Sequence, residues 1–261
     1  MINTLTTLAD KYENEGFLNG DPSWFMHQVK GERNQETMAF IASSLSFGSR
    51  QQFMPKIQYI LDCSHGEVYQ WVKDGGFNTD IPPTKDCFYR LYTYEDMNRF
   101  LRVLQDIIME WGSLKRFVAP DGTEGLLSAI DVLERITGFF CAHGIQGLVP
   151  KNTQSSCKRV CMFLRWMVRD GSPVDLGIWS DIIDKRTLII PLDTHVLQQA
   201  HHFGIIAAKT GSMATAKKIS EKMRSVFPDD PMKGDFALFG LGVKNRPSKS
   251  PLRETYLILP L

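Results

Sequence analysis

The chain has 261 residues, of which 43% are hydrophobic and 23% charged, with a formal net charge of +1. This composition is typical of a globular protein with one large domain or two closely packed lobes. A solenoid is not expected, because no period of about 20–50 residues recurs. A membrane span or a secretion signal is not expected either, because no apolar run approaches roughly 20 residues and no basic stretch precedes one.

The first half of the chain is dominated by helical periodicity. Two stretches, residues 36–47 and 97–111, repeat apolar side chains at helical spacing and are predicted to be core helices. Residues 63–95 between them contain three glycines and the pair Pro82-Pro83, so part of this segment is predicted to be loop.

The second half continues this pattern. After a break at residues 118–125, a helix is predicted over residues 126–142, then a turn over 143–156 and a strong helix from Cys157 to Arg169. Asp193 stands where an N-cap belongs, and Gly204 ends the helix that follows. No series of alternating strands is present, so the predicted fold class is all-α.

Charge and cysteines indicate the setting in which the protein acts. Residues 1–149 contain 13 Lys+Arg and 19 Asp+Glu, whereas residues 150–261 contain 17 and 10, so a polyanion is expected to meet the later half. Basic residues that merely solvate helices would explain the excess equally well. The five cysteines lack close CxxC pairs, which favours buried, reduced thiols and a cytoplasmic, nucleoid-associated location.

Residues 190–196, Ile-Pro-Leu-Asp-Thr-His-Val, form the most informative motif. This segment resembles one in the helix-hairpin-helix DNA glycosylases, which include endonuclease III and the 8-oxoguanine glycosylases. By that resemblance Asp193 is the catalytic aspartate. Lys158 begins a helix whose apolar pattern is similar to the second helix of the glycosylase hairpin, and by the same resemblance it is the nucleophile.

The resemblance has two departures. The hairpin of that superfamily usually has a Gly-Val-Gly turn whose backbone approaches a DNA phosphate, whereas residues 150–156 contain no glycine. Residues 170–188 lengthen the interval between Lys158 and Asp193 and resemble an insertion between lobes. The four-cysteine motif of endonuclease III is absent, so no iron–sulfur cluster and no other cofactor are expected.

Nearly the whole chain also resembles a bacterial family of uncharacterised proteins. The features that carry this resemblance are Asp21-Pro22, the helix at residues 157–168 with the segment 175–179, and the segment 233–242. This second resemblance implies no activity.

The glycosylase resemblance implies a definite chemistry. A glycosylase takes a nucleotide out of the base stack. The Lys158 amine would attack the sugar C1′ and form a Schiff base, which leads to strand cleavage. Asp193 would stabilise positive charge on the sugar, because a helix N-terminus keeps a carboxylate ionised. Taken alone, Asp193 is better explained as a helix N-cap and Lys158 as a surface lysine.

Further residues are assigned supporting roles. The predicted nucleic-acid contacts are Lys151, Ser155, Ser156, Arg165 and His195. Solvated ion pairs with Asp170 or Asp175 are the alternative for Arg165 and Arg169. The stacking candidates, each of which also suits a core position, are Trp24, Trp166, Trp179, Phe88 and Tyr92. The histidines lack partners for a metal site, and Lys244, Arg246, Lys249 and Arg253 form a loose basic run.

The predicted architecture has two helical lobes with a cleft between them. One lobe spans residues 34–170 and contains the hairpin, and the other combines residues 1–33 with 171–261. The leading functional hypothesis is a monomeric DNA repair glycosylase with AP-lyase activity on a damaged base, such as an oxidised purine, in double-stranded DNA. The alternatives are a non-catalytic DNA- or RNA-binding helical module and a helical protein that binds another protein.

Overall fold

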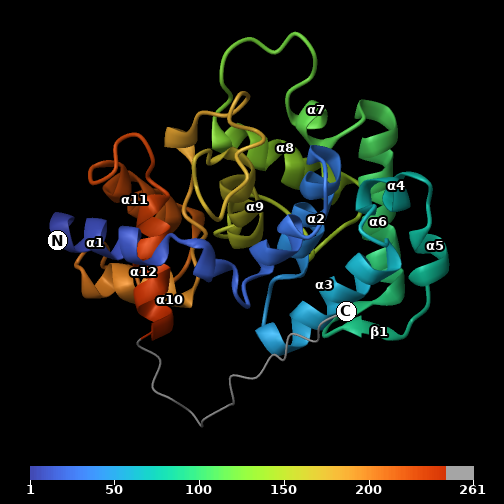
Figure 1. Ribbon diagram of the computed structural model, residues 1–261, viewed down its shortest axis with the longest axis horizontal. Coiled ribbons are helices and arrows are strands. Elements are labelled where there is room, and N and C mark those ends of the chain that lie inside the picture. Colours follow the sequence, from blue (N-terminus) through green and yellow to red (C-terminus); the bar gives the residue numbers. More distant parts are fainter. Residues whose placement is uncertain (245–261) are drawn as a thin grey trace.

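The structure is a computed structural model that describes residues 1–244, and helices predominate in it (Figure 1). This agrees with the all-α prediction, and within residues 1–244 no helix is long and apolar enough to cross a membrane. The elements in chain order are α1 (Ile2–Tyr12), η1 (Glu15–Leu18), η2 (Pro22–His27), α2 (Glu32–Leu45), α3 (Arg50–Cys63), α4 (Val68–Lys73), α5 (Phe77–Asp80), β1 (Cys87–Tyr89), β2 (Tyr92–Thr93), α6 (Tyr94–Trp111), α7 (Leu114–Val118), α8 (Ala129–Ala142), α9 (Lys158–Val168), η3 (Lys185–Thr187), α10 (Thr194–His202), α11 (Met213–Arg224) and α12 (Lys233–Lys244).

Helix α6 shows how local sequence sets the bounds of an element. Thr93 and Asp96 form a reciprocal capping box that satisfies the first free N–H groups. The helix therefore begins three residues before the apolar repeat that predicted it. It ends at Gly112, whose φ of 80° is the left-handed conformation that glycine adopts at little cost.

The centre of the core lies where α2, α6, α8 and α9 meet. Phe40 of α2 packs against Phe100, Phe140 and Phe163, one from each of the other three helices, with ring centroids 5.1–5.8 Å apart. The three pairs are stacked, tilted and edge-on, and aromatic pairs of this kind add to the stabilisation from burial. Helix α9, which carries the predicted nucleophile, is thereby fixed in the core along one face.

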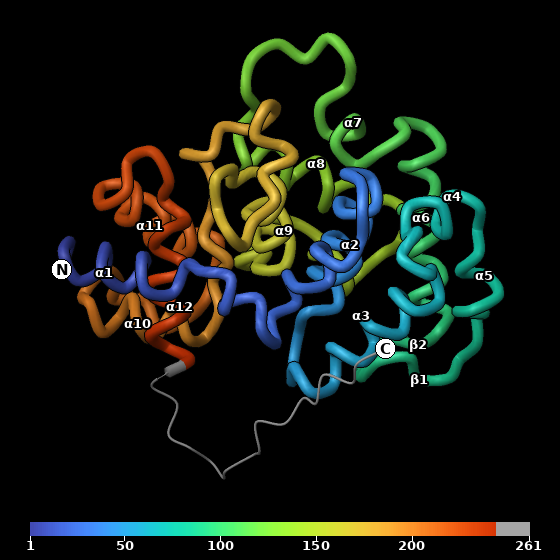
Figure 2. Tube along the Cα trace, in the orientation of Figure 1, coloured from blue at the N-terminus to red at the C-terminus, as the bar shows by residue number. Residues whose placement is uncertain are grey.

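The first and last helices of the described chain lie side by side. In Figures 1 and 2, α1 lies among α10, α11 and α12 at one end of the molecule, and α1 packs along α12. Two glycines of α12 permit its close approach to neighbouring helices. A Cβ at Gly240 would come within 2.3 Å of the Tyr12 ring of α1, and one at Gly242 within 2.8 Å of His195 Cβ of α10. Helices α1, α10, α11 and α12 thus lie together at one end of the molecule.

Two segments that the sequence analysis assigned to the second lobe contact elements of the first. Helix η2 packs on α2 and α3. Trp179 donates its indole N–H to Glu36 of α2 at 2.9 Å, and Ile183 forms a bridge with Leu127 just before α8. Residues 22–27 and 179–183 therefore pack with elements that were predicted to belong to the first lobe. The loop between α7 and α8 projects from the body of the molecule at the top of the view in Figure 2.

Candidate functional site

The structure brings Lys158 and Asp193 together. Lys158 Nζ lies 3.6 Å from Asp193 Oδ2, although 35 positions separate the two residues in the sequence. The lysine side chain is 36% exposed and the aspartate side chain 13% exposed. The amine is therefore open to a ligand, while the carboxylate sits deeper beneath it.

Each of the two side chains belongs to the first turn of a helix or to its cap. Asp193 is the N-cap of α10, and its Oδ1 accepts the N–H of Val196 at 2.8 Å, which leaves Oδ2 to face the amine. Lys158 is the first residue of α9, after Cys157, whose φ of 48° turns the chain sharply into the helix. The prediction that Asp193 caps a helix is confirmed.

The loop before α9 links the starts of three helices. Ser155 forms an antiparallel bridge with Ser212, the N-cap of α11, and Ser156 Oγ donates to the carbonyl of Leu192 at 3.4 Å. The N-termini of α9, α10 and α11 thus gather around this loop. Helix N-termini carry partial positive charge and free N–H groups, so the region is electrostatically suited to an anion.

The other predicted contacts in this loop remain open to solvent. Lys151 and Ser155 are exposed and Ser156 is half-buried. His195 is also half-buried, and its ring lies edge-on to Phe239 of α12 with centroids 6.1 Å apart. Their roles as nucleic-acid contacts stay predictions. The basic run 244–253 lies outside the residues whose side chains the structure describes.

Arg165 is not available to a phosphate, so that prediction was wrong. Its side chain is 4% exposed and pairs with Asp175 at 3.2 Å and Asp235 at 2.5 Å. Arg169, one turn later, is buried as well and pairs with Asp175, Asp230 and Glu13. A guanidinium that is buried this deeply stays in the interior because its carboxylate partners offset the free-energy cost of removing it from water.

Asp235 connects this buried network to the candidate site. Burial, helped by the like charge of Asp193, raises the pKa of Asp235 to about 6, against the lowering effect of Arg165. Helix α12 packs on α10, so Asp235 stands behind the capping carboxylate rather than in solvent. The charge of Asp193 is thus balanced on one side by Lys158 and opposed on the other by Asp235.

The stacking candidates chosen from the sequence are mostly core residues. Trp166, Trp179 and Phe88 are almost completely buried, which makes them wrong for contact with a base. Tyr92 is half-buried and packs edge-on against Phe47 at 5.4 Å. Trp24 is half-buried and packs edge-on against Phe25. Of the five candidates, only Tyr92 packs against Phe47.

A cluster formed by Phe47, Arg90 and Arg159 lies beside the site and was not predicted from the sequence. The guanidiniums of Arg159 and Arg90 lie 5.2 and 5.6 Å from the Phe47 ring centroid. Arg159 directly follows Lys158, and its Nη1 donates to Ser44 O at 2.7 Å. Phe47 ends the apolar stretch 36–47 and carries no charge, so only the three-dimensional contacts reveal its two arginine partners.

The comparisons with known proteins decide the family. The family model described as Protein of unknown function (DUF2400) matches residues 21–244. The chain belongs to this family. No curated protein and no solved structure matches the chain. Family membership therefore gives no activity, and the resemblance to the glycosylases stays a prediction from the residues.

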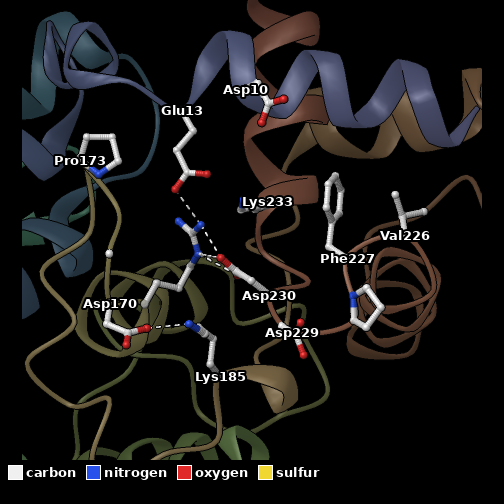
Figure 3. A pocket seen from close by; sticks show the side chains of 13 residues that line it. Asp10, Glu13, Asp170, Pro173, Lys185, Val226, Phe227, Asp229, Asp230 and Lys233 are labelled. Atoms are coloured by element: carbon white, nitrogen blue, oxygen red, sulfur yellow. Dashed lines mark hydrogen bonds and ion pairs between the residues drawn. The ribbon is translucent and has the colours of Figure 1, made fainter.

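A separate hollow of about 620 Å³ lies where α1 meets the loops around residues 170 and 228 (Figure 3). Its charged walls are largely paired with one another: Arg169 faces Glu13 and Asp230, and Lys185 pairs with Asp170 at 2.6 Å. Such internally satisfied charges leave little to bind a ligand. Lys158 and Asp193 do not line this hollow, and within residues 1–244 no cluster of metal-ligating side chains is present.

Proposed function

We propose that this protein is a DNA glycosylase with AP-lyase activity that uses Lys158 as nucleophile and Asp193 as its electrostatic partner. The observation that carries the proposal is the 3.6 Å approach of Lys158 Nζ to Asp193 Oδ2 at the starts of α9 and α10. An amine and a carboxylate with this mutual access are the groups that imine chemistry at a sugar carbon needs.

The reaction follows from the roles of the two groups. The unprotonated Lys158 amine attacks C1′, the C1′–N bond breaks, and the base leaves with its bonding electrons and takes up a proton. The C1′–O4′ bond then breaks, O4′ takes up the proton that Asp193 had removed from the amine, and a protonated imine joins Lys158 to C1′. Asp193 accepts the proton lost by the amine and stabilises positive charge on the sugar. Its own position is fixed by the bond to the Val196 N–H.

The surroundings of the pair support a DNA partner. Three helix N-termini gather at the loop before α9, and the exposed Lys151 lies in that loop. Residues 150–261 carry seven more basic than acidic side chains. Backbone phosphates are attracted by both features. A two-lobed glycosylase-like arrangement, acting as a monomer on a flipped nucleotide in the duplex, belongs to the same proposal.

Borohydride trapping tests the chemistry directly. Protein is incubated with duplexes that contain an abasic site or an oxidised purine, and sodium borohydride reduces any imine to a stable covalent adduct. We expect an adduct with the wild type and none with Lys158→Gln. Asp193→Asn should slow trapping by about 100-fold, as loss of a preorganised electrostatic group does elsewhere.

Lys30→Gln is the matched control, because it removes an exposed lysine that belongs neither to the pair nor to the loop before α9, and it should give the wild-type adduct yield. An equal adduct yield from Lys158→Gln would eliminate Lys158 as nucleophile. If folded wild-type protein gave no adduct with any of these duplexes, the lyase proposal would fail.

The second candidate is a DNA- or RNA-binding helical module without catalysis. The hairpin residues 150–156, which contain no glycine, favour this alternative, because side chains keep the backbone further from a phosphate. It predicts salt-dependent binding of nucleic acid with neither base release nor trapping. Filter binding at several salt concentrations, run beside the trapping assay, separates the two.

A further inference from the structure

Arg159 is a half-buried cation that no carboxylate of residues 1–244 pairs with. Arg165 and Arg169, one and two turns or more further along the same helix and its cap, each pair with at least two carboxylates. Burial acts to lower the pKa of all three guanidiniums, but the carboxylates more than reverse this effect for Arg165 and Arg169, whereas the pKa of Arg159 stays lowered. A charge that leaves water needs an opposite charge nearby, and the described chain gives Arg159 none.

Backbone groups offset only part of the Arg159 charge. Its Nη1 donates to the carbonyl of Ser44 at 2.7 Å, and its Nη2 donates to the carbonyl of Gly147. Ser44 belongs to the last turn of α2, and the C-terminus of a helix carries about half a negative elementary charge. These two bonds occupy only some of the N–H donors of a guanidinium. About half of the positive charge and several donors of Arg159 are therefore left for another partner.

Arg90 brings a second positive charge to the same aromatic ring. The Arg90 guanidinium lies 5.6 Å from the Phe47 ring centroid, and the Arg159 guanidinium lies 5.2 Å from it. Gly48, with a φ of 82°, makes room for this arrangement, because a Cβ there would overlap Arg90 Nη1. Arg90 has no carboxylate partner within residues 1–244 either. Like charges that lie close together repel, so an anion would stabilise this pair.

Two tyrosines fix the ring that the arginines share. Tyr89 and Tyr92 pack edge-on against Phe47, with ring centroids 4.9 and 5.4 Å away. The Tyr89 hydroxyl also donates to the carbonyl of Phe47. The Tyr92 hydroxyl lies so close to Gly147 that a Cβ there would come within 2.6 Å of it. The ring is thus held in place before any ligand arrives, and little order is lost on binding.

We propose that Arg90 and Arg159 form a binding site for a phosphate monoester. Guanidinium groups bind phosphate oxygens through charge-assisted, paired N–H donors. A phosphate monoester carries a charge of about −1.5 to −2 at pH 7. Two guanidiniums without carboxylate partners match that charge better than they match a carboxylate or a phosphodiester, each of which carries a single negative charge.

The proposed reaction would produce such a group beside the site. In the imine formed by Lys158, a proton leaves C2′ to water and its electron pair forms the C2′–C3′ double bond. The C3′–O3′ bond breaks with its electrons on oxygen, which leaves a phosphate monoester at the 5′ end of the downstream strand. Arg159 directly follows Lys158 on α9, so we assign this 5′-phosphate as the ligand. The source of the phosphate rests on the proposed function, whereas the site itself does not.

Fluorescence anisotropy with the full chain and two gapped duplexes tests the assignment. The duplexes differ only in a 5′-phosphate or a 5′-hydroxyl at a single-nucleotide gap. We expect the wild type to bind the phosphorylated duplex about 10-fold more tightly, because the hydroxyl loses the charge-assisted bonds. Arg90→Gln and Arg159→Gln should each remove most of this preference. Arg135→Gln is the matched control and should keep it, because Arg135 is an exposed arginine that lies over a different ring, that of Phe117.

Isothermal titration calorimetry with inorganic phosphate tests the site without DNA. Phosphate should bind the wild type and Arg135→Gln, and Arg90→Gln and Arg159→Gln should lose this binding. Arg90 is exposed, so Arg90→Gln tests the site even if Arg159→Gln does not fold. Phosphate binding without the 5′-phosphate preference would sustain the site and make a free phosphate monoester its ligand.

Two results would overturn the site. One is a wild type that shows neither phosphate binding nor the 5′-phosphate preference, and the other is an Arg90→Gln protein that retains both at the wild-type level. A preference that depends on the two arginines, without borohydride trapping, would sustain the site and eliminate the lyase. Trapping without phosphate binding or preference would do the reverse.

Discussion

Glu36 predicts a defined pH dependence of stability. Its buried carboxylate accepts N–H groups from Leu114 at 2.8 Å, Lys115 at 3.0 Å and the Trp179 indole at 2.9 Å. It thereby joins α2 to the start of α7 and to the segment that follows α9. Burial raises the pKa of Glu36 from 4.5 to about 7, despite the opposing effect of these three donors.

The sign and size of the effect follow from this difference. A pKa that is higher in the folded protein contributes stability that is complete below about 4.5 and is lost as the pH rises through about 7. The full difference corresponds to about 3 kcal/mol, of which about 2.5 kcal/mol falls between pH 5 and pH 8. Glu36→Gln cannot ionise, so it should lack this part of the pH dependence.

Urea unfolding followed by circular dichroism at pH 5 and pH 8 measures the difference. Relative to Glu36→Gln, the wild type should lose about 2.5 kcal/mol between the two pH values. The wild type and Glu36→Gln share every other titrating group, including Asp235, so the difference between their unfolding free energies isolates the contribution of Glu36. Glu32→Gln, an exposed residue of the same helix, should run parallel to the wild type. Parallel curves for Glu36→Gln would show that Glu36 does not titrate in this range.

Three further substitutions test a buried ion network, a tight glycine and a helix cap, each by urea unfolding. Arg169→Met strands the carboxylates that its guanidinium pairs with and should cost about 3–5 kcal/mol; a change below about 1 kcal/mol would contradict the role of this network. Gly177→Ala should destabilise more than Gly171→Ala: both have φ near +68°, but only at Gly177 does a Cβ meet backbone, 2.6 Å from Asp170 Cα. Equal losses would refute that clash. Thr93→Ala should cost about 1 kcal/mol through loss of the α6 capping box, and no loss would mean that the cap is dispensable.

Local signals in the sequence predicted α9 and α10, the two helices that carry Lys158 and Asp193. The apolar repeat of residues 157–169 gave α9 within one residue, and Asp193 and Gly204 bracket α10 as expected. These signals act within one or two turns, so they are readable from the sequence. The meeting of Lys158 with Asp193 could be anticipated only through resemblance, because no local rule brings two helix starts together.

The misplaced side chains depended on partners far along the chain. The sequence offered Asp175 only as a solvated partner of Arg165, and it gave no sign of Asp235, 70 positions later, which also pairs with this buried guanidinium. Trp179 likewise occupies the core because Glu36, 143 positions earlier, accepts its N–H. Burial of a polar side chain requires a partner, and the sequence does not reveal which distant residue supplies it.

The pairing of α1 with α12 bears on how the chain folds during synthesis. The apolar face of α1, including Leu5 and Ala9, is covered by a helix that leaves the ribosome last among the described elements. Contacts between such distant segments form slowly, because a long loop must close first. The first helix therefore waits with its apolar side uncovered until almost the entire polypeptide has emerged. A nascent chain released before residues 233–244 would expose that surface to chaperones or to aggregation.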